Sequence, residues 1–354
     1  MKTFISKKGI KIKFDILYDV NNPYSIHGIY PYRGKMSAVD VRQILSQLPP
    51  KMLLDPFCGS GTIVYEAGKL NFNVFGIDSN PIAIQIAKAK FDSIDAKESI
   101  DRINYLIKNN GKDKSLKMPI KALKYFHEKT AQEIMYFFKQ YDKFSDYEKA
   151  AFLGSICLVA RGCNHYKWSS TQIGKISDTK RYIDFYKTFI NKIKKHCYPL
   201  RSSNHKLFQV DARNLSNYIQ EKSIDYVYTS PPYFDALDYT SNYTRIIHHL
   251  FGNDINDIKK YLIQNYDSYE DNMKKCFIEI SKVTKEDALI IFVVGDKKRG
   301  DKYIKGGDFF SNICDKKPNM IIEREYTKTA SSIWDKINQT QRKEQIVIWD
   351  KSTW

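Results

Sequence analysis

The chain has 354 residues and a formal net charge of +17, from 57 Lys and Arg against 40 Asp and Glu. Its apolar share of 42% is ordinary for a globular protein, and its longest apolar run, Ala288 to Val294, is far too short to span a membrane. This length can hold one large α/β domain with an insertion, or two domains. The charge favours a polyanionic partner, most simply nucleic acid, over a membrane surface, because no segment pairs its basic residues with a lipid-facing stripe.

The amino-terminal segment and the cysteines bear on localisation. Residues Met1 to Lys8 are basic but lack a long apolar segment and a small-residue cleavage site, so we expect no signal peptide. The six cysteines include no CxxC pair and no paired framework. We therefore expect reduced thiols, no metal site and a cytoplasmic location.

The first eighty residues predict a hairpin or arm followed by an α/β unit. Apolar and basic residues alternate over 10–14, and a helix is expected over 38–47, ending before two prolines. Met52 to Leu54 read as a short buried strand. The chain then turns through Gly59-Ser60-Gly61 into a helix that begins near Ile63.

Glycines at such a turn let the backbone approach a ligand, and the helix N-terminus offers unpaired N–H groups. A P-loop would need Lys-Ser/Thr after its last glycine, but Thr62-Ile63 follow Gly61. A nicotinamide fingerprint would need a small residue where Val64 stands. Both of these nucleotide motifs are disfavoured, which leaves other ligand loops of this form open, and a strand-turn-helix that binds no ligand is the structural alternative.

A second strand is predicted over 72–77, ending at Asp78, with a helix over 82–90 after it. A Rossmann-type fold places an acidic residue at this point, about twenty residues beyond the glycines, on the ribose hydroxyls of its ligand. A plain helix cap is the alternative role for Asp78.

Residues 95–205 interrupt this rhythm with helical periodicity alone, over 100–106, 120–141, 147–159 and 182–195. From Lys97 to Lys206 there are 23 Lys and Arg against 10 Asp and Glu, a net +13. The loop over 161–172 is polar, aromatic and basic, which suits base reading, although it could equally be an ordinary interhelical loop. The candidate nucleic-acid contacts, which become candidate DNA contacts under the resemblance given below, are Arg161, Asn164, His165, Lys167, Trp168, Gln172, Lys192, Lys194 and Lys195.

The α/β pattern resumes after the insertion. Strands are predicted at 207–211, ending in an acid, at 223–228, leading into Thr229-Ser-Pro-Pro-Tyr233, and at 288–294 after a helix over 273–283. The segments 321–326 and 345–349 predict a terminal antiparallel pair. This pattern favours an α/β fold.

Two strings resemble known motifs. Asp55-Pro-Phe-Cys-Gly-Ser-Gly-Thr62 resembles motif I, and Thr229-Ser-Pro-Pro-Tyr233 resembles motif IV, of the S-adenosylmethionine-dependent amino-methyltransferases. The resemblance covers the chain outside 95–205. It implies a Rossmann-like methyltransferase fold with a seven-stranded mixed sheet, a catalytic domain formed by 1–94 and 206–354, and a mainly helical insertion, 95–205, as target-recognition domain.

The resemblance also implies a cofactor site for S-adenosylmethionine. His27, Pro31 and Lys35 resemble the motif X region, Asp78 the motif II acid and Asp211 the motif III acid, which accepts from the adenine amino group. The implied cofactor residues are Tyr32, Lys35, Asp55, Pro56, Phe57, Cys58, Gly59, Gly61, Thr62, Asp78, Ser79, Asp211 and Ala212. One departure from the family is that the insertion falls between motifs II and III, which puts Asp211 in question.

The motif IV string suits methylation of an exocyclic amine. The nitrogen lone pair is delocalised into the base, so two hydrogen-bond acceptors are needed to redirect it at the methyl group. Ser230 and the Pro231 carbonyl can accept, since proline has no N–H, and Pro232 completes a rigid turn. Tyr233 can stack on a base flipped out of the duplex. We expect Ser230, Pro231, Pro232 and Tyr233 to be the catalytic residues.

Serine at the first variable position of motif IV is typical of cytosine-N4 enzymes, so methylation of N4 in double-stranded DNA is favoured over adenine N6. No Pro-Cys pair for C5 methylation occurs. RNA guanine-N2 methylation, and a non-catalytic nucleic-acid-binding protein, are further alternatives. The resemblance also implies a bacterial or archaeal source, a role in restriction-modification or epigenetic marking, and, in the first case, a cognate restriction endonuclease as partner. No membrane partner is expected.

Overall fold

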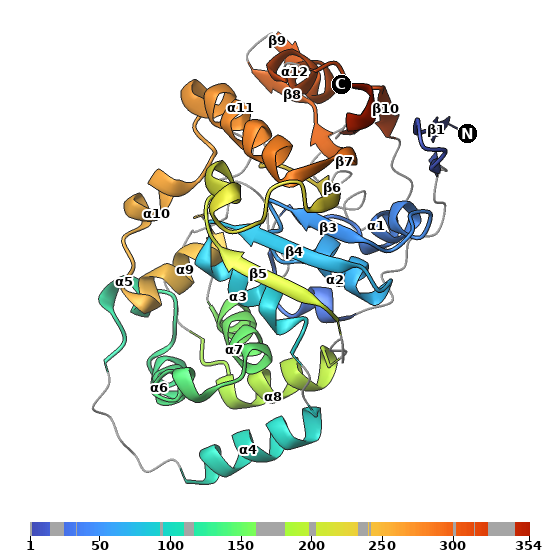
Figure 1. The fold of residues 1–354 in the computed structure, drawn as a ribbon. Helices are drawn as coiled ribbons and strands as arrows, with labels where there is room; N and C mark the ends of the chain where they lie inside the picture. The colour runs from blue at the N-terminus through green and yellow to red at the C-terminus, as the bar shows by residue number, and fades with distance from the viewer. Residues whose placement is uncertain are drawn as a thin grey trace.

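The computed structural model describes residues 2–14, 25–32, 34–92, 95–109, 117–160, 181–197, 203–232, 240, 242–299, 302–314, 316–324 and 344–354. A seven-stranded sheet lies at its centre, in the order β10-β11-β7-β6-β3-β4-β5 (Figure 1). These strands are β3 (Met52–Asp55), β4 (Asn73–Asp78), β5 (His205–Gln209), β6 (Ile224–Thr229), β7 (Thr284–Gly295), β10 (Met320–Arg324) and β11 (Glu344–Asp350).

The sheet is mixed. Strands β5, β4, β3, β6 and β7 run parallel, and β11 pairs antiparallel with both β7 and β10. The strand order reverses at β3, which has β4 on one side and β6 on the other. This is the predicted Rossmann-like methyltransferase fold, which is confirmed. Such a reversal opens a crevice at the carboxyl ends of the parallel strands.

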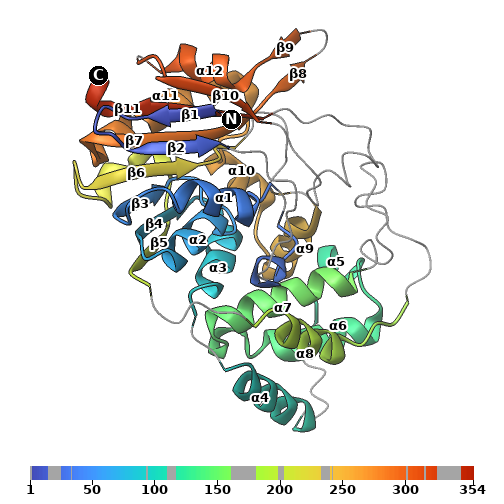
Figure 2. The same ribbon diagram turned by 90° about the vertical axis from the view of Figure 1, so that its right-hand side faces the viewer.

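Helices cover both faces of the sheet. Since successive residues of a strand point to opposite faces, neighbouring residues of β3 belong to different apolar clusters. Leu53 belongs to one apolar cluster with residues of α1 (Ala38–Leu45), α2 (Thr62–Lys69) and α3 (Pro81–Ala89). Leu54 belongs to a second cluster with residues of α11 (Tyr266–Val283) and α12 (Gly306–Ile313). Figure 2 shows α1 to α3 and α11 with α12 on opposite sides of the strands.

The insertion is helical, as predicted. It forms α4 (Ala96–Lys108), α5 (Ile120–Leu123), α6 (Glu128–Phe138), α7 (Asp146–Val159) and α8 (Phe185–Lys195). The single helix predicted over 120–141 is wrong: the chain leaves the helix after Leu123, and His127 starts α6 by accepting from the Lys129 N–H with Nδ1 at 3.1 Å.

The insertion shares its core with the rest of the protein. Phe126, Phe152 and Ile193 belong to the same apolar cluster as Leu53 and Val64. The Tyr147 hydroxyl joins α7 to α8 by donating to the Ile193 carbonyl at 2.9 Å. The division into a catalytic and a recognition domain remains a prediction.

Smaller elements flank the sheet. Strands β1 (Lys2–Ile5) and β2 (Lys11–Phe14) form the predicted amino-terminal hairpin, and the predicted antiparallel pairing of β10 with β11 is confirmed. The sequence patterns missed α9 (Asn242–Phe251), α10 (Ile255–Tyr261), α12, β8 (Lys297–Arg299) and β9 (Lys302–Ile304). Among the residues described, no helix is both long and apolar enough to cross a membrane.

Candidate functional site

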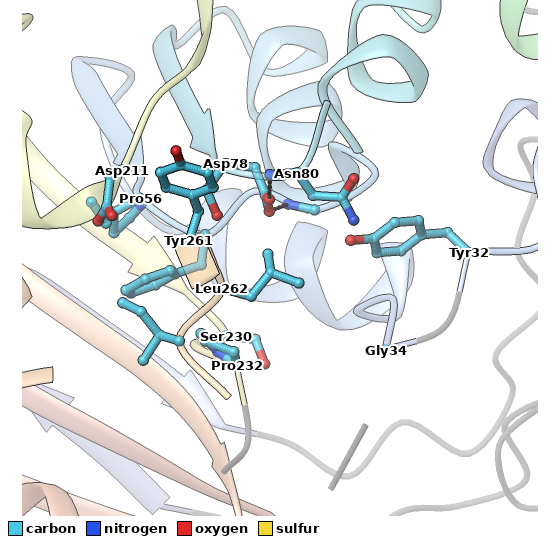
Figure 3. A pocket seen from close by; sticks show the side chains of 15 residues that line it. Tyr32, Gly34, Pro56, Asp78, Asn80, Asp211, Ser230, Pro232, Tyr261 and Leu262 are labelled. Atoms are coloured by element: carbon cyan, nitrogen blue, oxygen red, sulfur yellow. Dashed lines mark hydrogen bonds between the residues drawn. The ribbon is translucent and has the colours of Figure 1, made fainter. Parts of the chain in front are cut away.

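A cavity lies at the carboxyl ends of the parallel strands, where the strand order reverses. Its empty volume, open mouth included, is about 630 Å³, within the range of small-molecule sites. Figure 3 shows Tyr32 pointing its hydroxyl into the cavity from one side, with Asp211 and Pro56 on the opposite side. The lining residues are Tyr32, Gly34, Pro56, Phe57, Gly59, Asp78, Ser79, Asn80, Asp211, Ala212, Ser230, Pro232, Tyr261, Leu262 and Ile263.

A second, smaller cavity of about 290 Å³ adjoins the first, and both are lined by Gly34, Phe57, Gly59 and Ser230. It adds Lys35, Met36, Asp55, Cys58, Ser60, Thr62 and Ile63 to the wall. All the residues expected at the cofactor site, except Gly61, therefore line one of two adjoining cavities.

The glycines explain how the chain approaches this space. Gly61 has φ +76° and starts α2, and a Cβ atom there would lie 2.8 Å from the Ala87 Cβ. Gly59 has φ +50°, and a Cβ atom there would lie 3.3 Å from the ring of Tyr32. Both positions need a residue that tolerates the left-handed region and adds no bulk. Gly61 thus serves the packing of α2 on α3, while Gly59 serves the cavity.

Asp78 is the last residue of β4 and lies at the cavity wall. Its carboxylate accepts from the Gly59 N–H at 2.9 Å and from the Asn80 N–H at 2.8 Å, joining the glycine loop to the start of α3. Burial raises the pKa of Asp78 to about 6, against these two hydrogen bonds. The ribose role expected for Asp78 fits this position and remains a prediction.

Asp55 ends β3 and is fully buried. Its Oδ1 atom accepts from the Thr229 hydroxyl at 2.6 Å and from the Phe57 N–H at 3.2 Å. Burial raises the pKa of Asp55 to about 7, although the Thr229 hydrogen bond favours the ionised form. The carboxylate therefore titrates near neutral pH beside the smaller cavity.

Two polar groups in the walls lack a partner within the described part of the chain: the Thr62 hydroxyl and the Asn80 side-chain nitrogen. Both residues are at least 95% buried, so each group carries a desolvation cost that a polar ligand would offset. Together with the N-terminus of α2 and two carboxylates, they fit a ligand that carries a carboxylate and positive charges at one end and hydroxyl groups at the other.

The segment before α1 supplies the opposite wall. The Lys35 ammonium donates to the His27 carbonyl at 2.6 Å, and although the residue as a whole is exposed, desolvation of the ammonium lowers the pKa of Lys35. His27 itself is buried, with Nε2 at 2.7 Å from the Glu66 carboxylate and Nδ1 at 3.0 Å from the Lys90 ammonium. These contacts anchor the segment to α2 and α3.

Asp211 and Ala212 lie at the edge beyond β5, and both line the larger cavity. The Asp211 carboxylate accepts from the Arg213 N–H at 2.8 Å and from its guanidinium Nε at 2.9 and 3.0 Å. Because β5 pairs with β4, Asp211 shares a wall with Asp78 despite the long insertion between them. The adenine-binding role implied for Asp211 remains a prediction.

The motif IV residues follow β6. Ser230 lines both cavities, and Pro232 lines the larger one. Pro231, the residue between Ser230 and Pro232 in the chain, is buried. The Tyr269 hydroxyl donates to the Pro232 carbonyl at 2.5 Å. Tyr233 lies outside the described residues. The structure thus brings Ser230 to the same space as Asp55 and Gly59.

The candidate DNA contacts are mostly outside the described residues: Arg161, Asn164, His165, Lys167, Trp168 and Gln172. Lys194 and Lys195 are exposed near the end of α8. Lys192 is buried, and its ammonium donates to the Gly28 carbonyl at 3.2 Å. It is therefore a structural lysine rather than a surface contact, and the expectation that it binds DNA is corrected.

Several lining residues were not expected from the sequence: Gly34, Asn80, Tyr261, Leu262 and Ile263. Asn80 caps α3, with its side-chain oxygen accepting from the Ile82 N–H at 3.0 Å, and its side-chain nitrogen is one of the two unpartnered groups described above. Tyr261 to Ile263 join α10 to α11 and carry no motif, although Tyr261 is 62% exposed at the cavity. Within the described ranges, no three His, Cys, Asp or Glu side chains gather to hold a metal ion.

Comparisons with known proteins point to methyltransferases. A family model described as "RMKL-like, methyltransferase domain" matches residues 43–142. Type II methyltransferase M.MjaII of Methanocaldococcus jannaschii is 27% identical over 141 residues, which is 36% of this chain and 27% of that protein. Type II methyltransferase M.BsoBI of Geobacillus stearothermophilus is 26% identical over 275 residues, 64% of this chain and 53% of that protein.

The chain thus spans about half, or less, of the length of these relatives. Among solved structures, rRNA methyltransferase aviRa from Streptomyces viridochromogenes has 13% sequence identity and a TM-score of 0.32, covering 91% of this chain and 87% of that chain. A likeness this low supports no conclusion, so the fold assignment rests on the strand order.

Proposed function

We propose that this protein transfers a methyl group from S-adenosylmethionine to an exocyclic amino group of a base in DNA. One observation carries the proposal: Ser230 lines both cavities, together with the glycine loop that resembles motif I. Methyl transfer requires the methyl donor and the amine that accepts the methyl group to lie next to each other. The two strings line the same cavities although Ser230 follows Thr62 by 168 residues. The names of the two curated relatives support methyl transfer.

The cofactor would supply an electrophilic methyl group on a positively charged sulfur. Asp78, at the larger cavity, is suited to accept from ribose hydroxyls, and Asp211 and Ala212 border the same wall. The α2 N-terminus and the Thr62 hydroxyl are suited to a carboxylate, and Asp55 to an ammonium group. The two adjoining cavities would therefore hold the nucleoside end and the amino-acid end respectively.

The chain's own part in the reaction is to orient the amine. Ser230 and the Pro231 carbonyl accept from the two amine hydrogens and direct the nitrogen lone pair into the cavity. Such positioning can supply a large part of a rate enhancement, since orientation alone is worth up to about 7–11 kcal/mol of the barrier. Tyr233 would hold the flipped base by stacking.

Among amino groups we propose cytosine N4, with adenine N6 as the alternative. The support is the serine of Thr-Ser-Pro-Pro-Tyr, since this position distinguishes the two classes of enzyme that the string resembles. The substrate would be double-stranded DNA, bound by the basic helical insertion, with Lys194 and Lys195 on its exposed surface. A restriction endonuclease as partner is part of the same proposal, supported by the "Type II" of the relatives' names.

The test combines cofactor binding with product analysis. Titration calorimetry should detect S-adenosylmethionine binding to the purified protein. Incubation with labelled cofactor and mixed DNA, followed by nucleoside mass spectrometry, should give N4-methylcytosine. N6-methyladenine would move the assignment to the alternative base and keep the rest. Methylated RNA with unmodified DNA would overturn the substrate class, and no cofactor binding would overturn the activity.

A further inference from the structure

The motif IV turn is held at both ends by buried hydroxyl groups. Thr229, the residue before Ser230, is fully buried and donates to Asp55 Oδ1 at 2.6 Å. Tyr269 is 2% exposed, and its hydroxyl donates to the Pro232 carbonyl at 2.5 Å. The two bonds thus flank Ser230 and Pro231, the residues proposed to orient the amine.

The first bond arises from the sheet. Strands β3 and β6 are parallel neighbours, with Leu54 paired to Val227, so Asp55 and Thr229 end their strands at the same edge. Asp55 belongs to the motif I string and lines the smaller cavity. The Thr229 hydroxyl therefore joins the proposed methyl-donor side directly to the proposed amine side.

The second bond reaches across a longer stretch of chain. Tyr269 lies in the first turns of α11, just after the segment Tyr261 to Ile263 that lines the larger cavity. Its ring packs near Phe309 of α12, with ring centroids 5.6 Å apart. The helix that follows this part of the cavity wall thus also holds the carbonyl end of the turn.

Resting on the proposed function, we infer that Thr229 and Tyr269 are positioning residues, which set the Ser230–Pro231 acceptors relative to the bound cofactor. Neither needs to touch substrate. Thr229 acts through Asp55 and the start of the turn, and Tyr269 acts through the Pro232 carbonyl. Their removal should have different effects, because only Thr229 is bonded to a residue of the cofactor wall.

The Thr229 contact also affects the pH range of cofactor binding. The charged or titratable groups around Asp55 are Asp78 at the end of β4, the Cys58 thiol in the turn and Lys35 across the smaller cavity. A hydroxyl that donates to the carboxylate favours its ionised form, the form that attracts a cationic ligand. Without this donor, Asp55 should take up its proton at higher pH.

Tyr269→Phe removes the hydroxyl that holds the Pro232 carbonyl, so it should lower the single-turnover rate of methyl transfer at least about tenfold. A displacement of a reacting group by about 1 Å can cost about a hundredfold in rate. Its affinity for S-adenosylmethionine should stay at the wild-type value. Tyr147→Phe is the matched control, because it removes another buried tyrosine hydroxyl, in the insertion, that donates to a backbone carbonyl.

Thr229→Val should shift the pH midpoint of S-adenosylmethionine binding upward by about one unit, the size expected for one hydrogen bond to a carboxylate. Thr229→Ser, which keeps the hydroxyl, should restore the wild-type midpoint. Thr284→Val is the matched control, since Thr284 is equally buried but lies at the other end of the sheet, at the start of β7.

Thermal melting of each variant tests whether it folds. If wild-type protein binds no S-adenosylmethionine, the proposed function fails and not this inference alone. If the wild type binds and methylates, and folded Tyr269→Phe and Thr229→Val match it in rate and pH midpoint, the positioning roles are overturned. A rate loss in Tyr147→Phe equal to that in Tyr269→Phe would also overturn them.

Discussion

At the scale of single residues, the site depends on carboxylates that are costly to bury. Asp55, Asp78 and Glu66 all have a raised pKa, to about 7, 6 and 7 respectively, and burial is the largest cause in each. A folded state that holds such groups ionised is less stable than it would be without them. Glu66 is paired with His27 and Arg42 inside the protein, whereas Asp55 and Asp78 line the two cavities. Retaining Asp55 and Asp78 at a cavity wall is the pattern expected of a binding site rather than of a core.

Asp55→Asn should separate stability from binding. The pKa of Asp55 is higher in the folded than in the unfolded chain, so the folded protein binds the extra proton between about pH 4 and 7 and loses relative stability as pH rises through that range. The amide cannot ionise, and its oxygen can still accept from Thr229. The melting temperature of the variant should therefore exceed that of the wild type at pH 8.

The same variant should bind S-adenosylmethionine more weakly by about 1.5–3 kcal/mol, the value of a charge-assisted bond. Calorimetry at pH 8 measures this loss, and melting curves at pH 4 give an internal control in which the stability difference should vanish. A variant that binds normally at pH 8 would remove Asp55 from the cofactor site.

Ser230→Ala tests the proposed chemistry. The change removes one acceptor and leaves the Thr229 and Tyr269 bonds in place, so the chemical step should slow by about a hundredfold while cofactor affinity changes little. Single-turnover kinetics with saturating DNA measure the first, and calorimetry the second. An unchanged rate would show that Ser230 does not accept from the target amine.

At the scale of elements, the insertion and the wall of the larger cavity share the segment over 25–32. Helix α7 packs so closely on this segment that a Cβ atom on Gly154 would lie 2.0 Å from the Ile29 carbonyl oxygen. Lys192 of α8 donates to Gly28 in the same segment, and Tyr32 follows at the cavity. The helices of the insertion thus support the wall that carries Tyr32 and Lys35.

Gly154→Ala should therefore destabilise the protein, although alanine is the better helix former. Helix propensity favours alanine by up to about 1 kcal/mol, whereas overpacking against fixed backbone costs about 3 kcal/mol. Urea denaturation should show a net loss of about 2 kcal/mol. Leu158→Ala, on the same helix but 47% exposed, is the control and should stay within about 0.5 kcal/mol of wild type. A stabilised Gly154→Ala would mean that α7 does not pack here.

At the scale of the whole molecule, the positive charge is unevenly distributed. The segment from Lys97 to Lys206 carries a net +13 of the total +17. Its helices lie on the α3 side of the sheet, away from α11 and α12 (Figure 2). If this face binds DNA, affinity should fall steeply with salt, because each neutralised phosphate releases counterions.

The double variant Lys194→Glu, Lys195→Glu should weaken DNA binding and reduce the slope of log affinity against log salt by about 2. Fluorescence anisotropy at several salt concentrations measures both. Lys275→Glu with Lys316→Glu makes the same charge change at exposed positions outside the insertion. Equal losses in the two double variants would indicate a long-range effect of net charge and no contact at α8.

Local chemistry in the sequence predicted much of what lines the two cavities of the candidate site. The glycines at 59 and 61, and the acid that ends β4, follow from backbone geometry and strand ends, which act over a few residues. Short apolar segments likewise predicted strands of the sheet, alternation over 10–14 predicted the amino-terminal hairpin, and helical periodicity predicted the insertion. Tertiary structure alone decided which distant groups meet. The sequence predicted a surface role for Lys192, but the packing of α8 buries this residue. Thr229 contacts Asp55 because β3 and β6 are paired neighbours. Tyr261 to Ile263 line the larger cavity because the chain passes it between α10 and α11. A sequence specifies periodicity and local geometry, whereas burial and approach depend on contacts between segments that lie far apart along the chain.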